Sequence, residues 1–191
     1  MKIVKVKNVN LENLAGEIKK GKVIIFPTDT VYGLITDATN KKAVDNISQI
    51  KKREKQKPIP IFVKDIKQAK RIAKINKNQE KFLKKAWPGK VTAILERKKA
   101  KLYGVDKKTI GLRVPKYNLI LRLIETLDCP LTGTSANISG KAANTRIKEV
   151  IKQFKNRKLQ PDLIIDAGNL KKSKPSKVID LTGITPKVLR K

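Results

Sequence analysis

The chain has 191 residues, and 39% of them are hydrophobic, which suffices for one domain with a buried core and excludes wholesale disorder. One cysteine and no histidine exclude an internal disulfide, Ser-His-Asp and Cys-His catalysis, and the usual zinc sites. The 46 basic and 16 acidic residues give a formal net charge of +30, which attracts nucleic acids and nucleotides, although an aromatic content of 4% does not favour base stacking.

The N-terminal half alternates strand and helix patterns. Residues 2–7 alternate apolar and basic side chains, which predicts a strand, whereas a signal peptide would need an uninterrupted apolar stretch. No apolar run approaches the roughly 20 residues that span a bilayer, so we expect a cytoplasmic protein without a membrane segment. Asn10 is placed to cap a helix that Gly21 ends, and a buried strand over 23–26 is closed by Pro27. The periodicity then predicts a helix over 40–52, a strand over 59–63, a helix capped by Asp65 and a helix over 77–86.

The C-terminal half contains strands that follow one another without a helix between them. Such a pattern favours a mixed sheet over a purely parallel one. We therefore predict an α/β fold, a single domain over residues 1–191 with a twisted mixed sheet flanked by helices. The remaining predicted elements are strands over 91–95 and 110–114, a helix over 118–127, a strand over 131–134, a helix over 145–154, a strand over 163–166, and short strands near 177–181 and 187–190.

A polar segment, Pro27-Thr-Asp-Thr-Val-Tyr-Gly-Leu34, directly follows the buried strand. The end of a strand is a common place for a ligand site, and Thr28, Asp29 and Thr30 offer hydroxyls and a carboxylate there. Gly33 lets the backbone turn or approach a ligand closely. An ordinary turn stabilised by the same side chains is equally compatible with the segment.

A basic cluster ends the helix predicted over 40–52. It contains Lys51, Arg53, Lys55 and Lys57, at a helix end where cations also interact favourably with the dipole. One interpretation is a clamp for a polyphosphate, in which arginine contributes its planar fork and lysine a point charge. The other is a run of solvated charges.

The loop over residues 132–140 consists largely of small hydroxyl, amide and glycine residues. Such a loop can present backbone N–H groups to a phosphate, and Ser135 and Asn137 can bond the same phosphate or a metal ion. A plain connecting loop would have the same composition.

Arg113 lies inside the apolar strand predicted over 110–114. A buried guanidinium is costly unless it is paired. A substrate carboxylate would pair with it through two parallel hydrogen bonds. An internal aspartate or glutamate would resolve the same cost, and the sequence leaves the two alternatives open.

Together these motifs resemble the YrdC-like family, whose members include threonylcarbamoyl-AMP synthases. Any one motif is weak, whereas five in this order and at this spacing are specific. The resemblance runs from about residue 8 to the C-terminus and implies an α/β domain with a wide, basic concave cleft. The five motifs are PTDTVYGL at 27–34, K-x-R at Lys51 and Arg53, WPGKVT at 87–92, LRVP at 112–115, and S-x-N at Ser135 and Asn137.

The resemblance implies a nucleotidyltransferase. Such an enzyme would convert L-threonine, bicarbonate and ATP into threonylcarbamoyl-AMP and pyrophosphate, with Mg²⁺ accompanying the ATP. A separate tRNA-modifying transferase complex would then place the threonylcarbamoyl group on an adenosine of tRNA. The chemistry needs no protein nucleophile, because orienting the substrates and neutralising phosphate charge suffices, and a chain without histidine is compatible with it.

The same resemblance implies site residues, with Arg113 on the carboxylate of threonine. Some relatives have a histidine where this chain has Phe62, so a contribution of Phe62 to the threonine pocket is left open, as are the metal ligands. The residues implied to hold threonine are Thr30, Arg113 and Ser176. The residues implied to carry catalysis are Lys51, Arg53, Ser135 and Asn137. The residues implied to surround ATP are Lys51, Arg53, Lys57, Thr109, Gly133, Ser135, Asn137, Ala143 and Arg190.

Two other functions are left open. A charge of +30 also fits an RNA-binding or ribosome-associated protein, which would bind RNA without ATP or threonine and with a steep salt dependence. A carbamoyl-adenylate-forming carbamoyltransferase domain would use carbamoyl phosphate, but such domains usually lie in longer chains with other catalytic domains. Because longer relatives carry an extra C-terminal domain beyond the position of Arg190, we expect any closure of the cleft here to come from its own loops.

Overall fold

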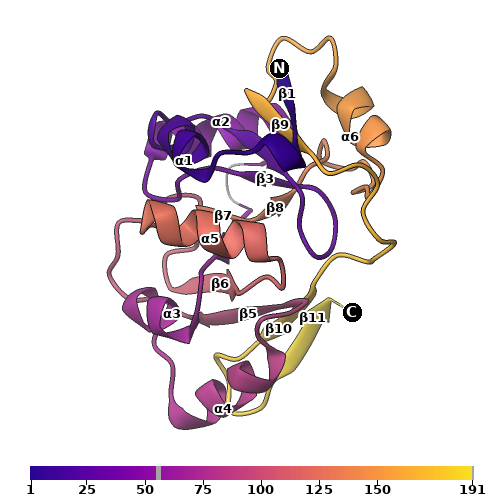
Figure 1. Ribbon diagram of the computed structural model, residues 1–191. Coiled ribbons are helices and arrows are strands. Elements are labelled where there is room, and N and C mark those ends of the chain that lie inside the picture. The colour runs from indigo at the N-terminus through magenta and orange to yellow at the C-terminus, as the bar shows by residue number, and fades with distance from the viewer. Residues whose placement is uncertain (55–56, 191) are drawn as a thin grey trace.

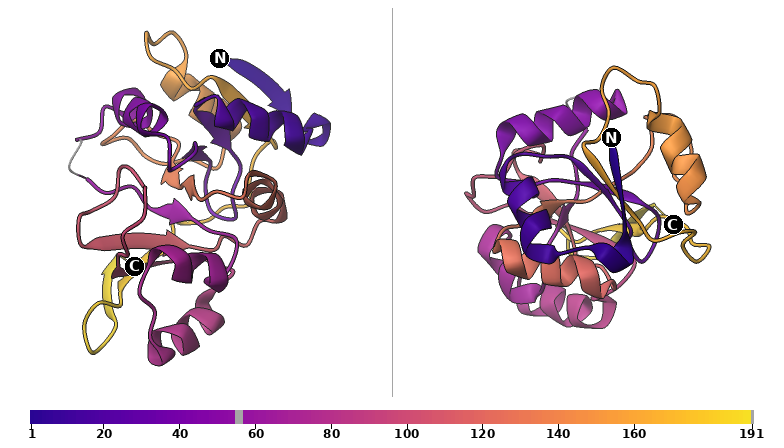
Figure 2. Two further views of the ribbon diagram at one scale, coloured as in Figure 1. Left: turned by 90° about the vertical axis from the view of Figure 1, so that its left-hand side faces the viewer. Right: turned by 45° about the horizontal axis from the view of Figure 1, so that its top comes forward.

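Two mixed sheets with helices on their faces make up the fold (Figure 1). The computed structural model describes residues 1–54 and 57–190, so Lys55 of the basic cluster lies outside the described residues. The predicted α/β class is confirmed, but the strands divide into two sheets where one was predicted. Figure 2, left, shows the yellow C-terminal hairpin at the far end of the molecule from the N-terminal strand.

The first sheet, the upper one in Figure 1, has the strand order β1-β9-β2-β3-β8. Strands β1, β9 and β2 run parallel, and β3 and β8 are antiparallel to their neighbours. Strand β2 is buried along its whole length, because helices cover both faces of this sheet. The strands are β1 (Lys2–Lys5), β2 (Ile24–Phe26), β3 (Gly33–Ile35), β8 (Thr134–Ser135) and β9 (Leu163–Asp166). The helices are α2 (Lys41–Lys51) and α6 (Ile147–Phe154) on one face and α1 (Leu11–Lys19) and α5 (Asn118–Leu127) on the other.

The second sheet, the lower one, has the order β11-β10-β5-β6-β4-β7. Helices α3 (Ile66–Ile72) and α4 (Lys77–Ala86) pack on one face, against residues such as Leu95 and Leu112. Because side chains alternate along a strand, Thr92 and Arg113 point to the opposite face, which lines a cleft. The strands are β4 (Ile61–Phe62), β5 (Val91–Glu96), β6 (Thr109–Arg113), β7 (Leu131–Thr132), β10 (Lys177–Asp180) and β11 (Lys187–Arg190).

The two sheets meet at Gly133. The strand predicted over 131–134 is split there, because β7 pairs with β4 in the lower sheet and β8 pairs with β3 in the upper one. A Cβ atom on Gly133 would lie 2.5 Å from a ring carbon of Phe62, so any other residue would force the ring to shift where the chain crosses between the sheets. The backbone N–H of Thr132 also donates to the carbonyl of Thr36 at 2.9 Å.

Helix ends follow the signals in the sequence. The side chains of Asn10 and Asp65 cap α1 and α3, and Gly21 has a φ of +85° just after α1. The first strand is shorter than predicted, because residues 6–8 form a 3₁₀ turn (η1, Val6–Asn8). Pro60 lacks an N–H and leaves β4 with two residues. No helix within residues 1–54 and 57–190 is both long and apolar enough to cross a membrane.

Candidate active site

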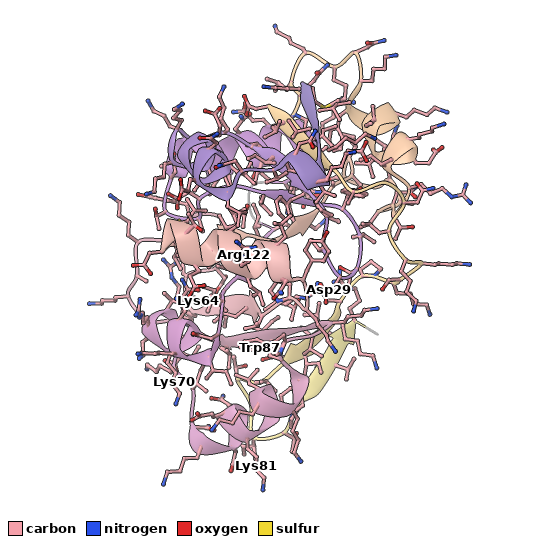
Figure 3. The ribbon with its side chains drawn as sticks, viewed as in Figure 1. Asp29, Lys64, Lys70, Lys81, Trp87 and Arg122 are labelled. Atoms are coloured by element: carbon pink, nitrogen blue, oxygen red, sulfur yellow. The ribbon has the colours of Figure 1, made fainter. Side chains whose placement is uncertain are left out.

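A cleft of about 360 Å³ lies between the open face of the lower sheet and the strand ends of the upper sheet. Figure 3 labels Asp29 at this boundary, on the loop between β2 and β3. The pleat of the lower sheet positions the floor, and the turns after β2 and at β8 position the wall. The floor residues are Thr92, Ile94, Thr109, Gly111 and Arg113, and the wall residues include Thr28, Thr30, Gly33, Thr134 and Ser135.

Arg113 is the most buried charged group of the cleft, with 3% of its surface exposed. Its Nη2 donates to Asp29 Oδ1 at 2.6 Å, its Nη1 to Thr30 Oγ1 at 3.3 Å, and its Nε to the Gly89 carbonyl at 2.9 Å. Burial lowers the pKa of Arg113, and the charge of Asp29 partly offsets that effect. Three of the five guanidinium N–H groups are used by these partners, which leaves two that a carboxylate could take.

Asp29 is the internal partner that the sequence left open for Arg113. Its side chain is 8% exposed, and its second oxygen, Oδ2, has no hydrogen-bond partner among the described residues. The same segment forms a turn, in which Thr28 Oγ1 donates to the Val31 carbonyl at 2.7 Å and accepts from the Thr30 N–H at 3.1 Å. The turn and the ligand-site interpretations are therefore compatible, because the turn presents the Thr30 hydroxyl to the cleft.

Ser176 also lines the cleft, within a small polar network. Its Oγ lies 2.9 Å from Thr92 Oγ1, and its carbonyl accepts from Arg190 Nε at 3.0 Å and Nη2 at 2.7 Å. Thr92 was missed as a site residue, although it ends the WPGKVT motif and its neighbours in β5 alternate between core and cleft. Arg190, which is predicted to contact ATP, therefore donates to the backbone of Ser176, which is predicted to contact threonine.

The residues predicted to surround ATP divide into two groups. Arg53, Thr109, Gly133, Ser135 and Arg190 line the cleft, whereas Lys51, Lys57, Asn137 and Ala143 do not. Arg53 donates from Nε to the Lys57 carbonyl at 3.2 Å and from Nη2 to the Pro58 carbonyl at 2.8 Å. Burial lowers the pKa of Arg53. The roles of all these residues stay predictions.

Phe62 lines the cleft beside both Gly133 and Arg113. Its ring contacts Gly133 and lies 5.8 Å from the guanidinium carbon of Arg113, which is within cation–π distance. The ring adds an apolar surface but no hydrogen bond. A substrate at this point would therefore meet a hydrophobic wall beside a cation.

The described part of the chain offers little to a metal ion. No three His, Cys, Asp or Glu side chains within it gather closely enough to hold one, and no carboxylate of the described residues lines the cleft. The polar groups of the cleft are thus hydroxyls, backbone groups and guanidinium groups, beside apolar side chains such as Phe62 and Ile94. Such a donor set suits anions, amides and carboxylates.

Comparisons with known proteins give concordant results. The sequence model of the Sua5/YciO/YrdC family, described as telomere recombination, matches residues 17–191. A putative threonylcarbamoyl-AMP synthase of Methanocaldococcus jannaschii is 39% identical over 187 residues, which cover 94% of this chain and 87% of that protein.

Two solved structures resemble this one closely. Sua5 of Pyrococcus abyssi, complexed with L-threonine, matches with a TM-score of 0.89 at 33% identity, covering 100% of this chain but 57% of that one. YciO of Escherichia coli matches with a TM-score of 0.86 at 28% identity, covering 100% and 94% of the two chains. This chain therefore spans little more than half the length of the Pyrococcus protein. YciO itself is described as uncharacterized.

Proposed function

Since this chain belongs to the Sua5/YciO/YrdC family, we propose that it is a threonylcarbamoyl-AMP synthase that acts on L-threonine, bicarbonate and ATP. The observation that carries the proposal is one cleft with a buried cationic site at Arg113, which keeps two N–H groups for a carboxylate, and a second cationic region with a hydroxyl at Arg53 and Ser135. These two regions suit an amino acid and a polyphosphate, respectively.

The proposed reaction forms one C–N bond and one P–O bond. The amine of threonine bonds to the carbon of bicarbonate, and water leaves, giving a carbamate. A carbamate oxygen then attacks the α-phosphorus of ATP, and the bond from that phosphorus to the bridging oxygen breaks. The products are threonylcarbamoyl-AMP, pyrophosphate and water, and no side chain is consumed.

The residues of the cleft would act by orientation and by charge. Arg113 would hold the threonine carboxylate with its two remaining N–H groups, beside the Thr30 hydroxyl. Arg53 and Ser135 would face the phosphates and reduce the charge that develops on pyrophosphate. Fixing the carbamate and the α-phosphorus in line converts an encounter in solution into a reaction within one complex.

Mg²⁺ would enter with ATP as part of the substrate. Magnesium sites of this kind take substrate phosphates and several waters, and the described cleft lining adds hydroxyls rather than carboxylates. The product is an activated mixed anhydride, so a tRNA-modifying transferase is the kind of partner that would consume it.

The test is pyrophosphate release from ATP by the purified protein, with threonine and bicarbonate omitted in turn. Release that requires both, with threonylcarbamoyl-AMP identified by mass spectrometry, is the expected result. Release driven by carbamoyl phosphate would instead indicate a carbamoyltransferase activity. No release under any condition, together with salt-sensitive RNA binding, would overturn the proposal in favour of an RNA-binding protein.

A further inference from the structure

Lys51 is a buried cation that the proposed reaction does not contact directly. It is the last residue of α2, and only 2% of its surface is exposed. Arg53, two residues further on, lines the cleft, whereas Lys51 does not. Among the described residues, no carboxylate lies within ion-pair distance of its ammonium group. A lysine this buried is rare without a partner, so its contacts call for an explanation.

Oxygen atoms of the S-x-N loop (residues 135–141) surround the ammonium. Lys51 Nζ donates to the Ser135 carbonyl at 2.5 Å, to the Asn137 carbonyl at 2.7 Å and to Asn137 Oδ1 at 3.3 Å. These three acceptors match the three N–H groups of an ammonium. The carbonyl of Lys51 also accepts from the Ser139 N–H at 2.8 Å. Both the main chain and the side chain of Lys51 thus hold the loop.

Asn137 is committed to the same loop. Its Oδ1 accepts from Ser135 Oγ at 2.5 Å, and its Nδ2 donates to the carbonyls of Ile138 at 2.9 Å and Lys141 at 2.6 Å. Of the two named residues of the motif, only Ser135 lines the cleft. A phosphate that contacted Lys51 directly would leave buried carbonyl oxygens without their donor, which is costly.

We propose that Lys51 is a positioning residue that holds the S-x-N loop from behind, so that Ser135 and the loop backbone meet the nucleotide in one fixed shape. The identity of that nucleotide as ATP rests on the proposed function, whereas the loop contacts do not. Lys51 then favours phosphate binding through the geometry of the loop and through its charge, which acts across one layer of residues.

The charge balance around Lys51 is consistent with this role. Burial, with a smaller contribution from the charge of Arg53, lowers the pKa of Lys51 to about 7. Ser135 and Asn137, whose oxygens accept from the ammonium, carry no titratable side chain, and Lys141 is the titratable residue of the loop. A triphosphate beside Ser135 would favour the charged form of Lys51, so nucleotide binding near neutral pH should be accompanied by proton uptake.

The first test uses the unaltered protein and an amine-reactive label, with modified lysines quantified by mass spectrometry. Lys42 lies on the same helix and is exposed, so it is the internal reference. We expect Lys51 to be modified about a hundredfold more slowly than Lys42 without any ligand, and still more slowly with ATP, which favours the unreactive charged form of Lys51. Rapid modification of Lys51 that ATP suppresses would overturn the proposal, because it would indicate a direct phosphate contact.

The second test compares Lys51→Met with the control Lys42→Met. Without ligand, amide hydrogen exchange of residues 135–141 should accelerate in Lys51→Met alone. In the activity assay, Lys51→Met should raise the KM for ATP about ten- to a hundredfold and leave the KM for threonine within about twofold, because a lysine needed only for overall stability would affect both alike.

Failure of the proposed function and failure of the proposed role of Lys51 give different results. If the unaltered protein releases no pyrophosphate, the proposed function fails, and the labelling and exchange measurements still decide the role of Lys51. If exchange of the loop is unchanged in Lys51→Met while ATP turnover is lost, Lys51 contacts the nucleotide itself and the proposal is wrong. If Lys51→Met does not fold, the labelling measurement on the unaltered protein decides whether the loop holds Lys51.

Discussion

The pair of Arg113 and Asp29 makes a prediction that separates folding from substrate binding. The two side chains are 4% and 8% exposed and are joined at 2.6 Å. Arg113→Met keeps a similar length but leaves the Asp29 carboxylate buried without its cation. Asp29→Asn keeps an acceptor for Nη2 and removes the charge. The double variant removes both charges together.

The magnitudes follow from the burial of the pair. Breaking a buried ion pair by removing one partner costs about 3–5 kcal/mol, whereas replacing both partners by uncharged groups of similar volume is often nearly neutral. For a chain of this length, each kcal/mol corresponds to roughly 2–4 °C of melting temperature. Arg113→Met should therefore melt about 6–20 °C below the unaltered protein. The double variant should recover most of that loss, which is the signature of a coupled pair.

The assay is thermal unfolding without ligand, with Arg122→Met as the control for loss of an exposed arginine. Figure 3 labels Arg122 on α5. The double variant should then be folded but inactive, with kcat/KM for threonine lowered about 10²-fold or more, because two charge-assisted hydrogen bonds to the carboxylate are gone. If Arg113→Met is as stable as Arg122→Met, the predicted contribution of the buried ion pair to folding is refuted. A double variant with unaltered kcat/KM would refute the carboxylate assignment.

Three further predictions concern single sites. Gly133→Ala would place a Cβ 2.5 Å from the Phe62 ring, so urea unfolding should show a free energy of unfolding lower by about 1–3 kcal/mol. Phe62→Leu should restore part of that loss. An unchanged urea midpoint in Gly133→Ala would contradict this packing. Burial and the neighbouring Asp37 raise the pKa of the Cys129 thiol to about 12, so at pH 8 alkylation should be about a thousandfold slower in the folded protein than in urea, and equal rates would contradict a buried thiol. Arg190→Met removes an exposed side chain and should shift the free energy of unfolding by less than about 0.5 kcal/mol. The same change should raise the KM for a substrate about tenfold. A large loss of stability with unchanged KM values would mean that Arg190 serves folding and not substrate binding.

The elements that sequence patterns predicted well are those with local signals. The helix after Asn10 has an N-cap and ends before a glycine in the left-handed region, and both are properties of a few adjacent residues. Strand β3 was missed because Gly33 closely follows Thr28, Asp29 and Thr30 and suggested a turn, whereas the pairing of β3 with β2 and β8 is decided by distant residues. The division into two sheets depends likewise on the contact between Gly133 and Phe62, which are far apart in the chain.

The candidate site shows the same distinction. The apolar strand around Arg113 predicted that burying its charge would be costly without a partner. It did not predict which acidic residue would pair with it, because the fold decides that Asp29 lies there. The K-x-R pattern placed Lys51 and Arg53 in one predicted clamp. Helix α2 ends at Lys51, and Lys52 has a left-handed backbone conformation with φ of 51°, so the chain turns between Lys51 and Arg53 and the helical spacing does not continue to Arg53. The Lys51 side chain points into the S-x-N loop, and that of Arg53 lines the cleft.

The cations of the cleft differ from the rest of the +30 charge in how they are held. Arg113, Arg53 and Arg190 each donate to a carboxylate or a backbone carbonyl, so their positions are set before a ligand arrives. Most other basic side chains project from the periphery, as the nitrogen tips in Figure 3 show. Mobile surface charges bind RNA by releasing counterions, and that affinity falls about 10³–10⁵-fold between 50 and 200 mM salt for several phosphate contacts. Preorganised, partly buried contacts are screened much less. The KM for ATP should therefore change far less than RNA affinity over the same salt range, and a KM that rises as steeply as RNA binding weakens would mean that the cleft recognises ATP only as a polyanion.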